Sequence, residues 1–265
     1  EPLLARSFDE NDTDKLSPHA NTPMVHYNDG LGRLIRVDEL SRLNDDGTSA
    51  EALKTWTTRY EYDLNDQLTR ITDSQNNQKW MQYDGLKRKT FMNDPDRGEM
   101  TFVFDDASNL VETTDAKKQR ITYTYDGANR IRSEDYHDEG QAFSANLAFN
   151  PALPISSANR PDVAYFYDAA QVGLDVGDGS VATAANVRGK LAYVWDLAGE
   201  EHTSYDARER VGWVVKRVRD PIHGQLVNFR TAFAYDSLDR ITGLTYPDND
   251  GIGYQYNDRS LLARI

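Results

Sequence analysis

The sequence predicts an all-β protein built from stacked β-hairpins, and a regular spacing of aromatic residues is the main reason. An aromatic residue followed by Asp recurs every 21 residues at Tyr62, Tyr83, Phe104 and Tyr125. A second aromatic residue usually stands two positions earlier, as expected for a strand with one buried face. A fixed period of this length is typical of repeat arrays, in which each unit is stable only against its neighbours. We therefore expect a spiral of hairpins.

The aromatic-Asp pair belongs to a signature that extends through most of the chain. An Arg often follows the aromatic residue by five positions, and an aliphatic residue follows it by six. We expect the aromatic side chains to form buried cross-strand ladders. We expect the Asp to hold its turn by pairing with the Arg, as in Asp126 with Arg130. The signature residues are Tyr62, Asp63, Tyr83, Asp84, Phe104, Asp105, Tyr125, Asp126, Arg130, Tyr167, Asp168, Tyr205, Asp206, Tyr235, Asp236, Arg240 and Tyr256.

The turn after each aromatic residue is predicted from its polar residues. Asp can bond to its own backbone and tolerates the turn conformation, and a Gly or Asn often follows within three residues. We expect the glycines to supply the positive φ angles, which cost glycine nothing sterically. Two strands of about six residues and two short turns account for the period.

Residues 1–23 are polar and predict an irregular lead-in, whereas residues 24–265 predict the repeat array, which is cleanest at 56–136. The first repeat, at 24–37, carries one inserted residue after Tyr27. Residues 36–54 fit either a hairpin arm or a short helical insertion around Asp45 to Gly47.

Two interruptions follow the clean array. The prolines of 137–161 and the Gly- and Ala-rich composition of 171–189 predict longer loops on one edge of the array. The 42 residues between Tyr125 and Tyr167 predict two periods with one degenerate copy between them. Strands are expected again at 190–196 and 213–218. Because Tyr256 opens a repeat that Ile265 truncates, we expect the chain to be a fragment of a longer array.

Composition excludes several function classes. The chain has 265 residues, with 30 basic and 43 acidic side chains and a formal net charge of −13. This balance argues against a nucleic-acid partner, whose phosphates are bound by clustered Lys and Arg. The absence of Cys excludes disulfides and thiolate sites, and no apolar run approaches the ~20 residues of a membrane span.

Searches for catalytic and metal motifs predict neither an enzyme nor a cofactor. The five His residues form no zinc-type pair, and neither a nucleophile elbow nor a phosphate-binding Gly-Lys loop occurs. Clustered oxygens at Asp248, Asn249 and Asp250 are weak candidates for calcium, with further candidates at 175–178 and 9–14. None has the bidentate Glu of a calcium-binding loop, so a solvated turn is the alternative.

Three segments resemble a known family. The stretches 27–34, 125–131 and 235–241 are similar to the Tyr-Asp repeat of the RHS/YD-repeat family, and most similar to the B- and C-component branch of bacterial Tc toxins, which forms a cocoon. The resemblance covers the chain from Tyr27 onward. Departures from the family pattern include Asn109 in place of Arg and Lys89 in place of the aliphatic residue. The self-cleaving motif that closes bacterial shells has no match here.

The resemblance implies a β-strand ribbon that forms part of a large hollow shell around a cytotoxic polypeptide. It implies a secreted bacterial virulence factor whose partners are other segments of the same shell, the enclosed toxin and a translocation component. A second hypothesis is an extracellular YD-repeat module that recognises a glycan or a partner protein. In that case the Tyr-Asp pairs would be sugar platforms and 137–158 a contact loop, although the strand spacing of the aromatic residues favours a structural role.

Overall fold

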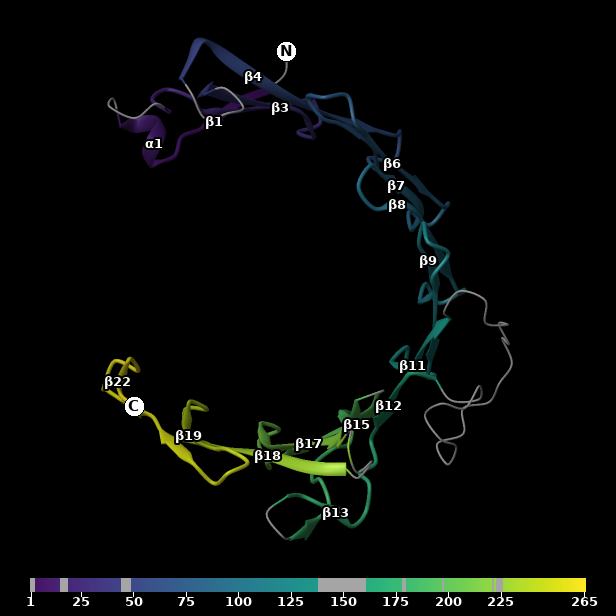
Figure 1. The fold of residues 1–265 in the computed structure, drawn as a ribbon, viewed down its shortest axis with the longest axis vertical. Coiled ribbons are helices and arrows are strands. Elements are labelled where there is room, and N and C mark those ends of the chain that lie inside the picture. Colours follow the sequence, from purple (N-terminus) through teal and green to yellow (C-terminus); the bar gives the residue numbers. More distant parts are fainter. Residues whose placement is uncertain are drawn as a thin grey trace. The chain divides into compact units, whose positions relative to one another are not determined.

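The computed structural model describes residues 3–14, 19–43, 49–137, 161–177, 180–196, 198–220, 222 and 226–265. The chain separates into two compact units, Glu1–Arg120 and Ile121–Ile265, which are described separately. Within the described residues, all elements except one helical turn are β-strands, as the sequence predicts (Figure 1). None of the described helical residues forms a segment long and apolar enough to cross a membrane.

The N-terminal unit is an antiparallel meander, in which each strand pairs with the next one along the chain. Its strands are five to fourteen residues long. Its elements are β1 (Leu3–Ser7), α1 (Glu10–Thr13), β2 (Met24–Asn28), β3 (Leu34–Leu43), β4 (Ser49–Tyr62), β5 (Leu68–Thr72), β6 (Gln78–Tyr83), β7 (Lys89–Asp94), β8 (Gly98–Phe104) and β9 (Leu110–Thr114).

The C-terminal unit continues the same pattern and adds two small hairpins, β13–β14 and β21–β22. Its main strands also pair antiparallel with their neighbours. Its elements are β10 (Arg120–Tyr125), β11 (Ile131–His137), β12 (Val163–Tyr167), β13 (Leu174–Asp175), β14 (Val181–Ala182), β15 (Leu191–Trp195), β16 (Gly199–Tyr205), β17 (Val211–Arg219), β18 (Leu226–Tyr235), β19 (Ile241–Thr245), β20 (Gly251–Gly253), β21 (Gln255–Tyr256) and β22 (Leu262–Arg264).

Two hairpin arms are longer than the standard repeat. β3 and β4 have 10 and 14 residues and pair with each other, so the arm interpretation of residues 36–54 is confirmed for the described strands. The alternative, a short helical insertion around Asp45 to Gly47, is not tested. Asp45 to Gly47 lies outside the described residues. The second arm is β17–β18, with strands of 9 and 10 residues. These two arms account for the longer intervals from Tyr27 to Tyr62 and from Tyr205 to Tyr235.

The predicted degenerate copy between Tyr125 and Tyr167 is absent from the strand order. β11 pairs directly with β12, through Ser133 with Ala164 and Glu134 with Val163. The 42 residues therefore contain one repeat with a long connection, and a doubled period was the wrong interpretation of this interval. Most of that connection, residues 138–160, lies outside the described residues.

The 171–189 segment is more ordered than the predicted loop. It forms the β13–β14 hairpin, which lies beside the strands from β15 to β18 (Figure 1). Leu174 and Val176 are almost fully buried against Val215 of β17, and Ala184 and Val187 pack with Ala192 of β15. Its Gly- and Ala-rich composition suggested a loop, but short apolar side chains also suit close packing on a sheet.

The lead-in also differs from expectation. β1 pairs with β2 over Leu3–Ser7, so these five residues are not irregular. α1 is a single turn whose capping box joins the Asp9 and Asp12 side chains to each other's backbone N–H groups at 3.0 and 2.9 Å. The polar composition of residues 1–23 as a whole concealed this strand, although β1 itself contains Leu3, Leu4 and Ala5 and is exposed along its length.

The signature aromatic residues are half-buried, not buried as expected. In the N-terminal unit each main strand packs chiefly on the strands before and after it, so one sheet layer leaves its face partly open. Met81 and Met92, which are cross-strand partners, are the most buried apolar residues of the clean array. The ladders therefore depend more on specific contacts than on burial.

Candidate functional site

The Tyr-Asp turn is one structure repeated along each unit. In the repeat of Tyr83, the Asp84 N–H donates to the Arg88 carbonyl at 3.0 Å, and the Lys87 N–H donates to the Asp84 carbonyl at 3.0 Å. The Asp84 Oδ1 accepts the N–H groups of Leu86 and Arg88 at 2.9 and 3.0 Å. The strand register shifts at Tyr83, which identifies a β-bulge beside the turn. The Asp thus closes the turn through its own backbone and side chain.

The Arg joins its own turn to the next one. Arg88 Nε donates to Asp84 Oδ2 at 2.6 Å, and Arg88 Nη1 donates to the carbonyl of Asp105 in the following repeat at 2.8 Å. The same guanidinium lies 5.0 Å from the ring centroid of Phe104. Arg33, Arg130, Arg210 and Arg240 make equivalent contacts with the rings of Tyr62, Tyr167, Tyr235 and Tyr256. We call this arrangement the arginine staple.

The tyrosine hydroxyl makes the reciprocal connection to the preceding repeat. Tyr83 donates to the Leu68 carbonyl at 2.8 Å, and Tyr235 donates to the Val211 carbonyl at 2.9 Å. In each case the acceptor is the aliphatic residue that begins the preceding return strand. The same bond is made by Tyr62, Tyr205 and Tyr256. Phe104 occupies the same position without a hydroxyl. The aromatic ring alone can therefore fill this position, and the hydrogen bond of tyrosine is an additional contact.

The turn carboxylates are held in the charged form. The backbone N–H of Arg88 lowers the pKa of Asp84, and that of Arg130 lowers the pKa of Asp126 in the same way. The pKa of Asp206 is lowered chiefly by the side chain of Arg210. The ion pairs predicted from the spacing of four are present, at 2.7 Å for both Asp126–Arg130 and Asp236–Arg240. These carboxylates are therefore engaged within the turn itself.

Three repeats vary the staple. Gln67 replaces Arg, and its Nε2 is buried without a hydrogen-bond partner among the described residues. Asn109 also replaces Arg and donates to Asp105 Oδ2 at 2.9 Å. In the repeat of Tyr167, the 169–188 segment is inserted within the turn itself, and Gly189 N–H donates to Asp168 Oδ1 at 2.6 Å.

Lys190 then takes the Arg position of that interrupted turn, with its Nζ 4.9 Å from the Tyr205 ring centroid. Sequence reasoning missed Lys190 because the insertion separates it from Tyr167. The signal that could have identified it is the aliphatic Leu191 directly after it, since the Arg of a standard repeat also precedes an aliphatic residue.

The glycines of the turns do not have the predicted role. The left-handed position is the third after Asp, where Lys87, Asn129 and Asp239 have φ angles of 65, 59 and 62°. Gly85 and Gly127, directly after the Asp, are not among the residues with positive φ. Type I turns followed by a left-handed residue are typical of hairpins with a bulge. Among the signature turns, the prediction holds for Gly32 and, in the interrupted turn of Tyr167, for Gly189, with φ angles of 82 and 77°.

The calcium candidates serve as turn and cap residues in the structure. Asp248 Oδ1 accepts the Asp250 N–H at 3.1 Å, and Asp175 Oδ1 accepts the Gly177 N–H at 2.9 Å. The backbone N–H of Asp9 lowers the pKa of Asp12, which Thr22 also contacts. Among the residues that the structure describes, no three acidic or histidine side chains are grouped so that they could hold a metal ion.

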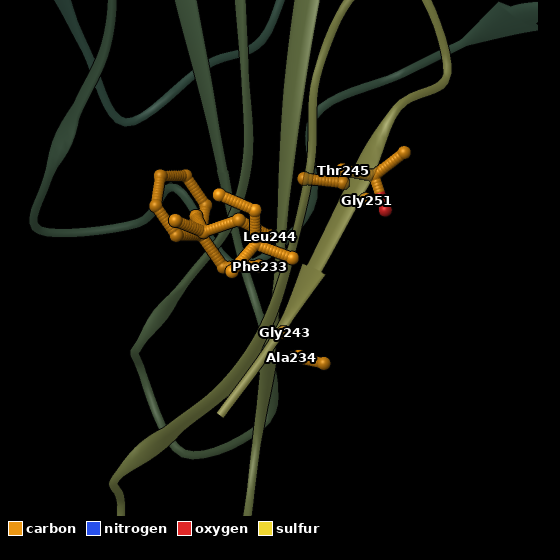
Figure 2. Close-up of a pocket in the computed structure, with 9 residues that line it drawn as sticks. Phe233, Ala234, Gly243, Leu244, Thr245 and Gly251 are labelled. Carbon is orange, nitrogen blue, oxygen red and sulfur yellow. The ribbon is translucent and has the colours of Figure 1, made fainter. Parts of the chain in front are cut away.

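A shallow hollow lies against β18, β19 and β20. Figure 2 shows Phe233 and Leu244, which are cross-strand partners, with their side chains together on one side of the strands. Its remaining lining residues are Ala232, Ala234, Gly243, Thr245, Gly251, Ile252 and Gly253. Because the Thr245 hydroxyl is the one polar side-chain group of this lining, the hollow has no acid or base for catalysis.

A buried polar cluster lies on the face that β13–β14 covers, and sequence reasoning missed it. His202 is 1% exposed, and its Nε2 donates to Glu200 Oε2 at 3.0 Å. Arg217 donates to the same carboxylate oxygen at 2.9 Å and to Asn228 at 3.0 Å. Burial acts to raise the pKa of Glu200, but His202 and the charge of Arg217 outweigh it and lower the pKa. Within this cluster each charge is paired, which is typical of buried structural groups.

Comparison with known proteins agrees with the repeat signature. Residues 104–141 match the model of the RHS repeat. The fold of the chain is similar to a crystal structure of TcdB2-TccC3, with a TM-score of 0.72 and 17% identity over 99% of this chain. It is also similar to the Tc holotoxin pore of Photorhabdus luminescens with a TccC3 mutation, with a TM-score of 0.73 and 17% identity over 99% of this chain.

The chain spans 13% of the length of each of these two solved chains. No curated protein matches it. The expected resemblance to RHS proteins of the Tc toxin branch is therefore confirmed for the fold, and at residues 104–141 by the repeat model itself. Residues 104–141 match the RHS repeat, and the chain has the fold of the Tc toxin structures.

Proposed function

We propose that this chain is a wall segment of an RHS-repeat shell that encloses a cytotoxic polypeptide before its delivery, as part of a secreted bacterial toxin. The observation that carries the proposal is the arginine staple, which bonds most Tyr-Asp turns to the next, as in Arg210 with Asp236 and Asp239 at 3.0 and 2.6 Å. A wall needs such lateral continuity, because a single hairpin is marginal alone. The likeness in fold to TcdB2-TccC3 supports the same role.

A structural role is favoured over an enzymatic one by what the charged signature residues do. Asp84, Asp126 and Asp206 each accept two backbone N–H groups and an Arg side chain. A carboxylate held in this way is anionic and directed at its own turn. It is therefore poorly placed to act as a general acid or base toward a substrate.

The ring contacts disfavour the alternative of a glycan-binding module. Sugars stack on free aromatic faces, whereas guanidinium groups lie over the rings of Tyr167, Tyr235 and Tyr256 at 4.4, 4.5 and 4.5 Å. The tyrosine hydroxyls of Tyr235 and Tyr256 are also bonded to carbonyl groups. Most of the candidate contact loop, 137–158, lies outside the described residues, which omit 138–160. In this proposal the partners are other wall segments, the enclosed polypeptide and a translocation component.

The proposal is tested on the full native polypeptide purified from its source. Its intact mass and negative-stain images should show a longer chain that forms a hollow particle. Mild protease should leave a C-terminal fragment protected inside the particle, and the same fragment should be digested after denaturation. A native chain that forms no cavity and protects no fragment would contradict the proposal. Affinity of that chain for glycans on an array would then support the binding module.

A further inference from the structure

We propose that Met81, Met92 and Met100 form a thioether site for a soft monovalent metal ion, copper(I). The observation behind this proposal is the register of three successive strands. Met81 of β6 is opposite Met92 of β7, which is in turn opposite Met100 of β8. Residues directly opposite on neighbouring strands have their side chains on the same face of the sheet. The three methionines therefore form one row across the N-terminal unit, which we call the methionine row.

The composition of this row is unusual for a sheet. It contains three of the four methionines of the chain. Strand positions favour β-branched and aromatic residues, and the rows on either side follow that preference on the same face. One contains Tyr60 opposite Ile71, and the other contains Phe102 opposite Thr113. A single methionine is readily explained as a filler of an irregular gap in a core. Three in one row share a second property, which is the sulfur atom.

The spacing of the strands allows the three sulfur atoms to converge. Neighbouring strands lie about 4.8 Å apart, so the backbones at Met81 and Met100 are roughly 10 Å apart, with Met92 midway between them. Methionine is unbranched and has three rotatable bonds, so the two outer side chains can lean toward the central one. One ion held above Met92 is therefore within reach of all three thioethers.

The burial of the row suits a bound ion that is shielded from water. Met81 and Met92 are 8% and 7% exposed, whereas Met100 is half-buried. The two buried thioethers would exclude water from the ion on one side. The row is open to solvent at Met100, which is the side from which an ion can enter.

The charges beside the row favour a monovalent ion. Lys79 and Asp94 are two positions along their strands from Met81 and Met92, on the same face, and they pair with each other at 2.8 Å. This pair has no net charge and thioethers are neutral, so the site offsets little of the cost of burying a divalent ion. Thioethers are soft ligands that select copper(I), and the chain has no Cys to compete with them. Copper(I) is therefore the ion that these groups favour.

The test titrates the whole chain with copper(I) under anaerobic conditions, in competition with the coloured chelator bicinchoninate. The chain should retain about one ion, and X-ray absorption at the copper edge should show sulfur ligands. A roughly hundredfold excess of magnesium should leave the copper bound, because magnesium prefers oxygen ligands. Failure to bind copper(I), or a spectrum with nitrogen and oxygen ligands alone, would overturn the proposal.

Matched variants separate the sulfur atoms from the packing. Leucine nearly conserves the volume of methionine, so Met92→Leu should fold like the parent by circular dichroism, while it should bind copper(I) at least about tenfold more weakly. Met24→Leu is the control, since Met24 lies in β2 outside the row, and its effect should be less than about twofold. Met100→Leu, at the half-buried end, gives the same comparison if Met92→Leu does not fold. Equal affinities of the row variants and the control would contradict the proposal.

Discussion

The guanidinium of Arg210 lies over the ring of Tyr235, 4.5 Å from its centroid, while its Nε donates to Asp206 Oδ2 in the preceding turn at 2.7 Å. One side chain thus bonds two successive repeats. We predict that Arg210→Ala lowers the free energy of unfolding by roughly 2 kcal/mol, because charge-assisted hydrogen bonds and a cation–π contact are lost together. Denaturant unfolding measures this loss.

Arg70→Ala is the control for that prediction. Arg70 pairs with Glu61 at 3.6 Å, and both side chains are about half-exposed, so its removal should cost less than about 0.5 kcal/mol. Arg210→Lys should lose most of what Arg210→Ala loses, since lysine lacks the planar fork that reaches Asp206 and Asp239 together. A lysine variant as stable as the parent would show that charge alone is sufficient.

Gln67 marks a repeat in which the staple is missing. Its buried Nε2 has no partner among the described residues, and the signature aromatic residue of the next repeat is Tyr83. Gln67→Arg should pair with Asp63 and cover the Tyr83 ring, which would raise stability by about 0.5–1 kcal/mol. Gln119→Arg, in a turn closed by Asp115, is the control and should change stability little. If Gln67→Arg is less stable than the parent, an Arg at the staple position does not stabilise every repeat, and this prediction is wrong.

The tyrosine hydroxyl is tested separately from its ring. Tyr83→Phe removes the hydrogen bond to the Leu68 carbonyl and should cost about 1 kcal/mol. Phe104→Tyr should gain up to that amount, because Phe104 occupies the same place without a hydroxyl. Thermal unfolding of the two variants gives both values. Tyr83→Phe should lower the stability and Phe104→Tyr should raise it. A change in the same direction for both variants would contradict the prediction.

Much of the fold could be predicted from the sequence because the repeat is short and local. The period of the aromatic residues identified the hairpins, and the spacing of Asp126 and Arg130 identified the pair within a turn. The contact of Arg210 with Tyr235 could not be predicted in this way. Its sequence separation depends on the length of the intervening arm, and the β17–β18 arm is longer than a standard hairpin.

The insertions were harder to predict, because they also change the sequence separation between residues that come into contact. Lys190 performs the role of the turn Arg, but the 169–188 segment separates it from Tyr167. Leu174 and Val176 become buried only because that segment folds back on Val215. No local pattern encodes such a contact. The half-burial of the aromatic ladders likewise follows from packing in one layer, which the strand period alone does not reveal.

Acid should weaken the connection between β6 and β7. Lys79 donates to Asp94 at 2.8 Å, and chiefly for this reason the pKa of Asp94 falls from 3.8 to about 2. A carboxylate with a lowered pKa stabilises the folded state above its unfolded pKa. This contribution should therefore be complete above about pH 4 and should disappear as the pH falls from 3.8 to about 2.

Lys79→Met tests this dependence. Without the ammonium, the pKa of Asp94 should move back toward 3.8, and the loss of stability between about pH 4 and 2 should become smaller, because the folded and unfolded pKa values of Asp94 then lie closer together. Carbon-13 NMR of the Asp94 carboxyl group measures the pKa directly. An unchanged pKa in Lys79→Met would show that the backbone N–H groups of Asp96 and Arg97 are sufficient to hold it low.

Two substitutions to alanine within one turn test which of its positions requires a residue that tolerates a positive φ angle. Gly127 has no atom within 4 Å of a Cβ built on it, and it is not among the residues with positive φ. Gly127→Ala should therefore be neutral or stabilise by up to about 1 kcal/mol, because alanine restricts the unfolded chain. Asn129 has φ of 59°, and Asn129→Ala should cost about 1 kcal/mol, since alanine tolerates the left-handed region less well than asparagine. Equilibrium unfolding in urea compares the two. A larger loss of stability for Gly127→Ala than for Asn129→Ala would show that the turn requires a glycine directly after the Asp, as the sequence first suggested.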